Sequence, residues 1–346
     1  MTITTATLET SRLNTGYRTV GNKNAAPVLF LHGNCSSSAF FDGVLEKLPE
    51  ELYGVAVDLR GFGASEAKTV DATRGLGDFA DDVHAFWQAH FDGRPVQLVG
   101  HSVGGGLALD LAVRHPAMVK SITLVAPMSP YGFGGTKGNN GELCTDDAAG
   151  SGGATANPEF VKRIQEQDAG AESDFSPRNV FRGFYVHQYE APNEDALVAS
   201  ILSTVVSDAN YPGDSTASEN WPAVAPGATG MNNAISPKYF NVSGFADVEN
   251  KPAVLWVRGD KDQIVSDNSM FDLGALGALG AVPGWPGEDA FPAQPMVGQM
   301  RAVLDAYKAN GGLYKEEVFA DCGHSPYIEQ EEKFLQTTLP FLLDQR

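Results

Sequence analysis

The sequence predicts an α/β protein with a doubly wound, mostly parallel sheet and a large helical insertion. Up to Val125, short apolar runs typical of buried strands alternate with segments of helical periodicity. The alternation resumes at Ala253, after a long interruption rich in Gly, Asn and Pro. Because helices that join parallel strands form right-handed crossovers, both stretches are expected to contribute to one sheet.

Six buried strands and the helices between them follow from this pattern. The strands are expected over residues 27–31, 53–57, 95–99, 119–125, 253–257 and 313–319. Helices are expected over residues 39–48, 76–91 and 102–114. In the second of these helices, apolar residues recur at helical spacing, namely Phe79, Val83, Phe86 and Trp87.

The interruption is too long and too regularly patterned to be a simple loop. It contains helical pieces at residues 158–168, 177–187 and 193–206. The expected organisation is therefore a core of residues 1–126 and 252–346 with a cap or lid of residues 127–251. A second irregular stretch, residues 270–295, is expected to fold against the cap or the mouth of the site.

The charge of the chain disfavours several classes of partner. Its 346 residues carry a formal net charge of -19 and no cluster of Lys or Arg, which disfavours nucleic acid and anionic membranes. The N-terminus lacks a secretory signal, and no apolar stretch approaches the roughly 18 residues of a membrane helix. The three cysteines have neither disulfide nor metal-ligand spacing. A cytoplasmic protein is expected, although a processed form without its leader would look the same.

The strongest chemical signal is the sequence Gly-His-Ser-Val-Gly at residues 100–104. It follows one expected strand and opens one expected helix, where small residues allow a tight turn that exposes the Ser102 hydroxyl. The N-terminus of that helix directs its dipole and free N–H groups toward developing negative charge. The pattern therefore predicts that Ser102 is a nucleophile.

A serine nucleophile needs a base, and the base needs an acid to orient it. His324 follows the last expected strand, so it should lie at the same edge of the sheet as Ser102. The acid follows the strand that ends near residue 257, where Asp260, Asp262 and Asp267 are the candidates. Because Asp260 suits a turn and Asp267 lies further on, Asp262 is favoured.

Two backbone N–H groups are expected to hold the oxyanion of the reaction. One belongs to Val103, directly after the nucleophile. The other is that of Asn34, in the loop after the first buried strand, where Gly33 lets the backbone approach closely. The serines at positions 36–38 are interpreted as a helix cap.

Taken together, these motifs resemble the α/β-hydrolase superfamily. The resemblance rests on the His-Gly-Asn loop at residues 32–34, Asp-Leu-Arg-Gly-Phe-Gly-Ala-Ser at 58–65, the turn around Ser102, residues 259–265 and Gly-His-Ser-Pro at 323–326. It covers roughly residues 15–126 and 252–346. It implies an α/β-hydrolase fold, a Ser-Asp-His order of the triad along the chain and a serine hydrolase activity.

Differences between this sequence and the motifs of known subfamilies narrow the range of expected reactions. Haloalkane dehalogenases and epoxide hydrolases carry Asp at the position of Ser102, which disfavours both activities. The loop at residues 32–36 lacks the His-Gly-Gly-Pro-Gly sequence usual in proline iminopeptidases. Its His-Gly-Asn-x-Ser-Ser-Ser sequence is similar to that of small acyl-homoserine lactone hydrolases, whose cap is smaller.

The favoured function is hydrolysis of a carboxylic ester or lactone through an acyl-enzyme, of the carboxylesterase or lactonase type. Hydrolysis of an amide or carbon–carbon bond, and perhydrolysis, need the same triad and stay open as alternatives. So does a ligand receptor built on a hydrolase scaffold. No phosphate loop, zinc-ligand spacing or dinucleotide fingerprint is present in the sequence, so no cofactor or metal is predicted.

A bulky and fairly apolar small-molecule substrate is expected from the aromatic residues of the insertion and of residues 270–295. Each of them is as well suited to packing in a core as to lining a pocket. The candidate substrate-binding residues are Gly33, Tyr131, Phe133, Phe184, Tyr185, Trp221 and Trp285. Cys35 and Cys322 are interpreted as buried reduced thiols.

Overall fold

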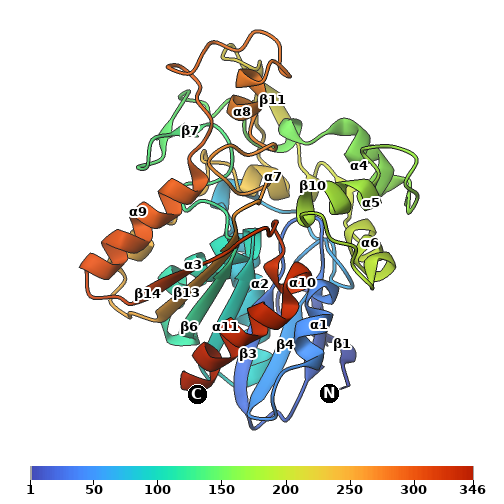
Figure 1. The fold of residues 1–346 in the computed structure, drawn as a ribbon, viewed down its shortest axis with the longest axis vertical. Coiled ribbons are helices and arrows are strands. Elements are labelled where there is room, and N and C mark those ends of the chain that lie inside the picture. The colour runs from blue at the N-terminus through green and yellow to red at the C-terminus, as the bar shows by residue number, and fades with distance from the viewer. Residues whose placement is uncertain (1, 346) are drawn as a thin grey trace.

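The computed structural model of the chain describes residues 2–345 and is built around one eight-stranded sheet (Figure 1). Six strands are parallel, and the first two pair antiparallel at one edge. In spatial order the strands are β1 (Thr4–Glu9), β2 (Asn14–Val20), β4 (Leu52–Val57), β3 (Ala26–Leu31), β5 (Val96–His101), β6 (Val119–Val125), β13 (Ala253–Gly259) and β14 (Tyr314–Phe319). The six parallel strands are those expected from the apolar runs.

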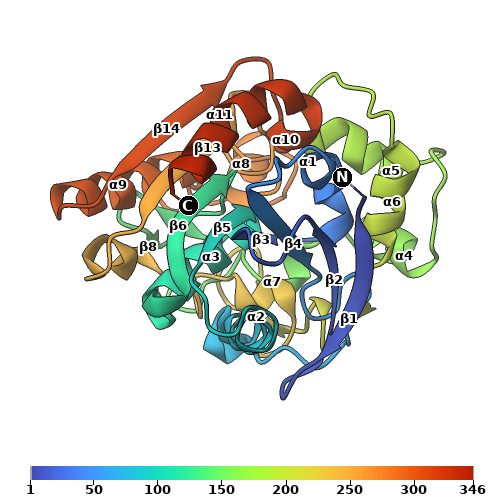
Figure 2. The same cartoon turned by 90° about the horizontal axis from the view of Figure 1, so that it is seen from below.

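Helices cover both faces of this sheet (Figure 2). One face carries α2 (Gly77–Phe91), α3 (Val103–Arg114) and α9 (Met296–Ala309). The other carries α1 (Asp42–Glu46), α10 (Pro326–Glu329) and α11 (Glu331–Asp344). The apolar core therefore lies in two layers, which accounts for strands that are apolar on both sides.

The strand order reverses direction at β3, because β4 lies on one side of it and β5 on the other. In open α/β sheets, ligands bind outside the carboxyl ends of the strands at such a reversal. The loops that follow β3 and β5 begin at His32 and Ser102 respectively. The topology thus brings the two expected halves of the oxyanion site together.

Residues 127–251 lie between β6 and β13, and most of them lie beyond the carboxyl ends of the strands (Figure 1). We call this segment the insertion. Its last part, with a 3₁₀ turn (Ser243–Asp247), packs against α3 and α9. Its helices are α4 (Pro158–Gln165), α5 (Pro177–Val180), a π-helical turn (Phe181–Tyr185), α6 (Glu194–Leu202) and α7 (Met231–Ala234). Its short strands are β7 (Thr136–Lys137), β8 (Glu142–Leu143), β9 (Val206–Ser207), β10 (Tyr211–Pro212), β11 (Ser215–Ala217) and β12 (Val224–Pro226).

The stretch 270–295 contains α8 (Leu273–Ala278) and packs against the insertion. The Trp221 and Phe291 ring centroids are 4.8 Å apart, and the Trp221 indole N–H donates to the carbonyl of Pro283 at 2.9 Å. No helix within residues 2–345 combines the length and the apolar character needed to cross a membrane.

Three features of the fold differ from the expectations. The antiparallel strands β1 and β2 and helix α9 were not expected. The segment 39–48 forms a 3₁₀ turn (Ser38–Phe41) followed by the short α1, with Ser37 as the N-cap. The helical piece expected at residues 193–206 ends at Leu202, and Val206 is part of β9.

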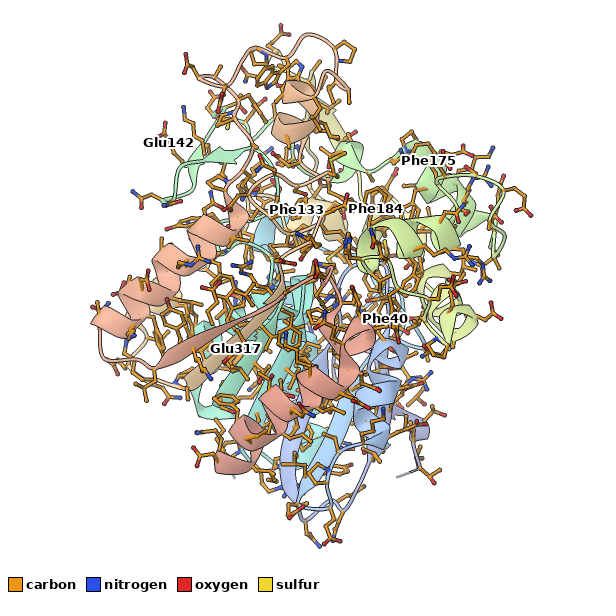
Figure 3. All side chains as sticks on the ribbon, viewed as in Figure 1. Phe40, Phe133, Glu142, Phe175, Phe184 and Glu317 are labelled. Carbon is orange, nitrogen blue, oxygen red and sulfur yellow. The ribbon has the colours of Figure 1, made fainter. Side chains whose placement is uncertain are left out.

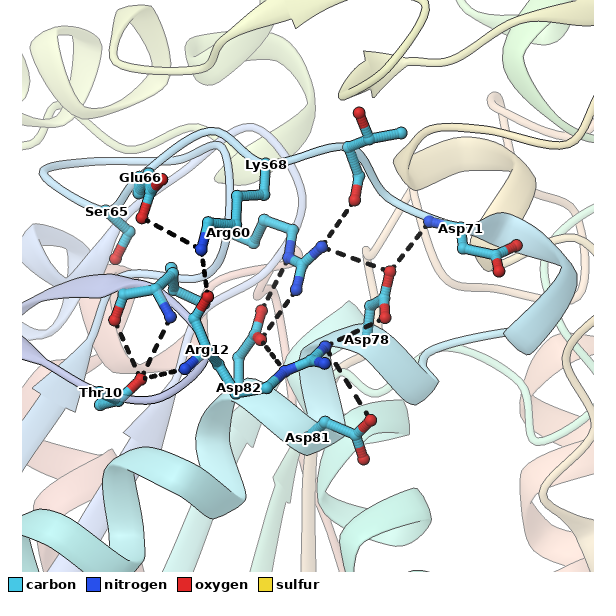
Figure 4. Close-up of polar contacts among 12 residues, drawn as sticks. Thr10, Arg12, Arg60, Ser65, Glu66, Lys68, Asp71, Asp78, Asp81 and Asp82 are labelled. Atoms are coloured by element: carbon cyan, nitrogen blue, oxygen red, sulfur yellow. Dashed lines mark hydrogen bonds and ion pairs between the residues drawn. The ribbon is translucent and has the colours of Figure 1, made fainter.

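A buried ion-pair network joins the N-terminal turn to the core (Figure 4). The Arg60 guanidinium donates to both oxygens of Asp82 at 2.8 Å and to Asp78 at 3.3 Å. Arg12, between β1 and β2, donates to the same two carboxylates at 3.0 and 3.1 Å. Because Arg60, Asp78 and Asp82 are all buried, the attraction between their opposite charges must offset the cost of removing them from water.

Candidate active site

Ser102 stands on a strained turn between β5 and α3. Its φ of 55° and ψ of -117° lie in a region that L-residues rarely adopt, and its own N–H donates to Val125 at 2.9 Å. Glycines on both sides make the turn possible. A Cβ at Gly104 would lie 2.1 Å from the carbonyl oxygen of Leu31, and one at Gly100 would lie 2.2 Å from that of Gly104.

Asp262 and His324 form a buried hydrogen-bonded pair. His324 Nδ1 lies 2.8 Å from Asp262 Oδ2, and the side chains of both residues are 2% exposed. The other carboxylate oxygen, Oδ1, accepts from the N–H groups of Ile264 and Val265 at 2.8 and 2.9 Å. These contacts fix the carboxylate, which in turn leaves Nε2 as the free nitrogen of the imidazole.

The two competing aspartates have other surroundings. Asp260 is exposed, and its nearest ionic partner is its neighbour Lys261 at 3.8 Å. Asp267 accepts from the N–H groups of Val297 and Gly298 at 2.8 and 3.1 Å, and so caps the N-terminus of α9. The geometry therefore favours Asp262 as the acid.

His101 connects the nucleophile turn to the His324 loop. Its Nε2 donates to the backbone oxygen of His324 at 2.9 Å, and its Nδ1 accepts from the Tyr327 hydroxyl at 3.2 Å. Burial, reinforced by the nearby His324 imidazole, lowers the pKa of His101 well below its usual value. His101 therefore acts as a neutral structural link between the two loops.

The loop after β3 lies directly against the nucleophile. A Cβ at Gly33 would lie 2.9 Å from the Cβ of Ser102. Within the described residues 2–345, neither the backbone N–H of Asn34 nor that of Val103 donates a hydrogen bond to another group. Both N–H groups are thus free to donate to a bound ligand.

The family profile described as "alpha/beta hydrolase fold" matches residues 26–142, a segment that contains the Asn34 loop and the Ser102 turn. Solved structures of the same fold superpose over nearly the whole chain. The chain therefore has the α/β-hydrolase fold.

Two of those structures illustrate how closely this chain resembles known folds. An esterase from Exiguobacterium antarcticum has a TM-score of 0.60 at 18% identity, with 97% of this chain and 98% of that one covered. A carboxylesterase from Bacillus subtilis has a TM-score of 0.58 at 14% identity, with 99% and 92% covered. At such identities the likeness concerns the fold alone.

Curated relatives align with only part of this chain. A protein named probable lysophospholipase BODYGUARD 1 from Arabidopsis thaliana is 37% identical over 115 residues, which are 32% of this chain and 24% of that protein. A 2-(acetamidomethylene)succinate hydrolase from Mesorhizobium japonicum is 32% identical over 113 residues, 32% and 39% respectively. Monoacylglycerol lipase abhd6-B from Xenopus laevis is 32% identical over 108 residues, 31% of each. The aligned part is thus well under half of each relative.

The aromatic residues expected in the substrate pocket do not all lie at the site. Tyr185 is buried at the site, with its ring centroid 6.2 Å from that of His324. Phe133 and Phe184, labelled in Figure 3, are both partly buried. Phe133 packs against the apolar core, and the Phe184 ring centroid lies 5.1 Å from that of Phe271. Trp221 and Trp285 instead pack around Phe291 in the outer stretch 270–295. Tyr131 packs closely on Gly141.

Several groups in contact with the site were not expected from the sequence. The Asn34 side chain donates to the Asn232 side chain, from α7, at 2.9 Å. Glu329, on α10, accepts from the N–H of Gly323, the residue before His324, at 2.9 Å. The Gly-His-Ser-Pro sequence at 323–326 identifies the loop, but no sequence motif indicates that Glu329 contacts it.

Cys35 and Cys322 are buried and unpaired thiols. Burial raises the pKa of Cys35 to about 12 and raises that of Cys322 as well. Both thiols are therefore protonated at neutral pH and are poor nucleophiles. Among residues 2–345, no cluster of three or more His, Cys, Asp and Glu side chains is arranged to hold a metal ion.

Proposed function

We propose that this protein hydrolyses carboxylic esters or lactones through an acyl-enzyme formed on Ser102. The observation that carries the proposal is the buried pair of Asp262 and His324, whose Oδ2 and Nδ1 atoms lie 2.8 Å apart. His101 joins the His324 loop to the strained turn of Ser102. An imidazole fixed by a carboxylate, on a loop joined to the turn of a serine, supplies the base that nucleophilic acyl transfer requires.

In the proposed mechanism, His324 Nε2 takes the proton of the Ser102 hydroxyl as its oxygen attacks the carbonyl carbon. The N–H groups of Asn34 and Val103 hold the resulting oxyanion. His324 then gives the proton to the leaving alkoxide as the carbon–oxygen bond breaks. A water molecule, activated by His324 in the same way, releases the acid and restores Ser102. Asp262 stabilises the imidazolium throughout.

The insertion is proposed to act as the cap over this site. Ser102 is only 7% exposed, and Tyr185 of the insertion is buried beside His324. An apolar cover excludes water and favours a substrate with an apolar acyl or alcohol part. Relatives named as a lysophospholipase and a monoacylglycerol lipase support a small ester of this kind.

An amide is the second candidate substrate. It is favoured by one observation, the partial relative named 2-(acetamidomethylene)succinate hydrolase. The triad chemistry is the same except that the leaving group is an amine, to which His324 must deliver the proton before the bond breaks.

Replacing Ser102 by Ala tests the proposal. p-Nitrophenyl esters of increasing chain length, lactones and anilides are offered to the wild type, to Ser102→Ala and to Ser11→Ala, an exposed serine between β1 and β2. Ester turnover is expected to fall by about 10³-fold or more in Ser102→Ala and to stay unchanged in Ser11→Ala. A fluorophosphonate probe should label the wild type and Ser11→Ala alone.

Equal turnover in Ser102→Ala and the wild type contradicts the assigned nucleophile. If the enzyme turns over anilides but no esters, the amide candidate replaces the ester proposal. Labelling without turnover of any substrate would instead favour a receptor on a hydrolase scaffold.

A further inference from the structure

A three-residue segment of the insertion, residues 185–187, lies across both loops of the proposed active site. On one side the Tyr185 hydroxyl is shared between the backbone oxygens of Asn34 and Cys35, at 3.1 and 3.2 Å. On the other side the N–H of His187 donates to Glu329 at 2.9 Å. The oxyanion loop and the His324 loop are thus both joined to the same short segment.

Glu329 makes the second of these connections with a single oxygen atom. Its Oε2 accepts from His187, in the insertion, and from Gly323, in the His324 loop, each at 2.9 Å. The carboxylate lies at the end of α10, about half-buried, and this burial raises its pKa. The two N–H donors offset the cost of placing the carboxylate there.

The backbones that Glu329 joins are in direct contact. A Cβ at Gly323 would lie 2.8 Å from the nitrogen of His187 and 2.9 Å from the carbonyl carbon of Val186. Only a glycine allows the insertion to rest on the His324 loop at this point. Any movement of residues 186–187 is therefore transmitted to the residue that precedes His324.

We propose that Glu329 is a positioning residue, which couples the seating of the insertion to the geometry of the His324 loop. The inference rests on the proposed function. With the insertion seated, Glu329 holds Gly323 and His187 together while Tyr185 holds the Asn34 loop. With it displaced, both loops lose a contact at once, so catalytic geometry is complete only beneath a closed insertion.

The kinetic test compares Glu329→Ala and Glu329→Gln with the wild type and with Glu332→Ala, an exposed glutamate on α11. Turnover of a short p-nitrophenyl ester is divided by the amount of enzyme that a fluorophosphonate probe titrates. Because His324 loses its fixed position, kcat of Glu329→Ala is expected to fall by about tenfold to a hundredfold, with KM changed much less. Glu329→Gln keeps an accepting oxygen and should recover most of kcat, and Glu332→Ala should match the wild type.

The second readout is independent of turnover. Hydrogen exchange at the amides of His187 and Gly323 should speed up in Glu329→Ala and stay near the wild-type rate in Glu329→Gln. Should Glu329→Ala fail to fold, Glu329→Asp replaces it, because its shorter side chain withdraws the oxygen from both donors and should give the same two changes.

Two results overturn the proposal: a titrated kcat of Glu329→Ala or Glu329→Asp within about twofold of the wild type, or unchanged exchange at both amides. Failure of the proposed function looks different. In that case the wild type itself neither turns over esters nor reacts with the probe, and the exchange rates alone decide whether Glu329 couples the insertion to the loop.

Discussion

Gly33 leaves no space between the loop after β3 and the nucleophile turn. An added Cβ there meets Ser102 Cβ at 2.9 Å and His101 Nδ1 at 3.2 Å. Both neighbours are buried and held by hydrogen bonds, so the loop that carries Asn34 must move instead. The backbone of Gly33 does not have a positive φ, so this effect is one of space and not of backbone strain.

Gly33→Ala is therefore expected to separate activity from stability. Displacing the Asn34 N–H by a few tenths of an ångström or more should lower kcat for esters by about tenfold to a hundredfold. The thermal unfolding midpoint should change little, because the loop can shift outward. Gly244→Ala, where a Cβ would meet nothing within 4 Å, is the matched control. Wild-type kcat in Gly33→Ala would contradict the role of this loop.

At this scale, the sequence identified the candidates for nucleophile and base but could not fully separate the acids. Ser102 lies between two glycines, after a strand and before a helix, and this local pattern can be recognised in the sequence. Three aspartates follow β13, and only their side-chain directions distinguish them: Asp262 faces His324 whereas Asp267 faces the end of α9. Contacts made through distant residues, such as Glu329 with His187, leave no local pattern.

Among the elements, the parallel strands were predictable and the peripheral ones were not. The six parallel strands are buried by helices on both faces, which produces the continuous apolar runs that the sequence displays. β1 is an edge strand rich in Thr, whose positions are exposed or partly buried, so burial imposes little pattern on it. Helix α9 lacks a capping side chain of its own, because Pro295 occupies its N-cap and Asp267 supplies the carboxylate from elsewhere.

The cap supplied by Asp267 can be measured as a free energy. Asp267→Ala leaves the N–H groups of Val297 and Gly298 without their acceptor, and is expected to lower the free energy of unfolding by about 1 kcal/mol. Urea denaturation followed by circular dichroism gives this value. Asp289→Ala, at an exposed aspartate in the stretch 270–295, should leave the free energy unchanged. Equal stability of the two variants would contradict the capping role.

For the whole molecule, the Arg60 network adds side-chain contacts between the antiparallel edge and the parallel sheet, which the backbone pairing of β2 with β4 already joins. Arg12 comes from the turn between β1 and β2, Arg60 from the loop after β4, and Asp78 and Asp82 from α2 (Figure 4). Such a network spans parts of the chain that are distant in sequence. The Asp-Leu-Arg-Gly segment is recognisable as a motif in the sequence, but its ion-pair partners leave no pattern there.

Arg60→Met is expected to destabilise the fold strongly. It keeps most of the side-chain volume but leaves two buried carboxylates with less compensation, at a cost of about 3–5 kcal/mol. Because the network is buried, high salt should reduce this loss only slightly. Urea denaturation at low and high salt measures both effects, with Lys120→Met, an exposed lysine, as control. A decrease in the free energy of unfolding of less than about 1 kcal/mol would contradict the prediction, because it is the size expected for an exposed ion pair.

The contacts of residues 185–187 also limit how this protein could be redesigned. Exchanging the whole insertion for that of another hydrolase is an obvious way to change substrate preference. Such a chimera would discard the Tyr185 hydroxyl and the His187 N–H together with the old pocket wall. A chimera that keeps residues 185–187 and exchanges the insertion on either side of them would keep their contacts with the Asn34 and His324 loops. The surface expected to bind substrate would still be replaced.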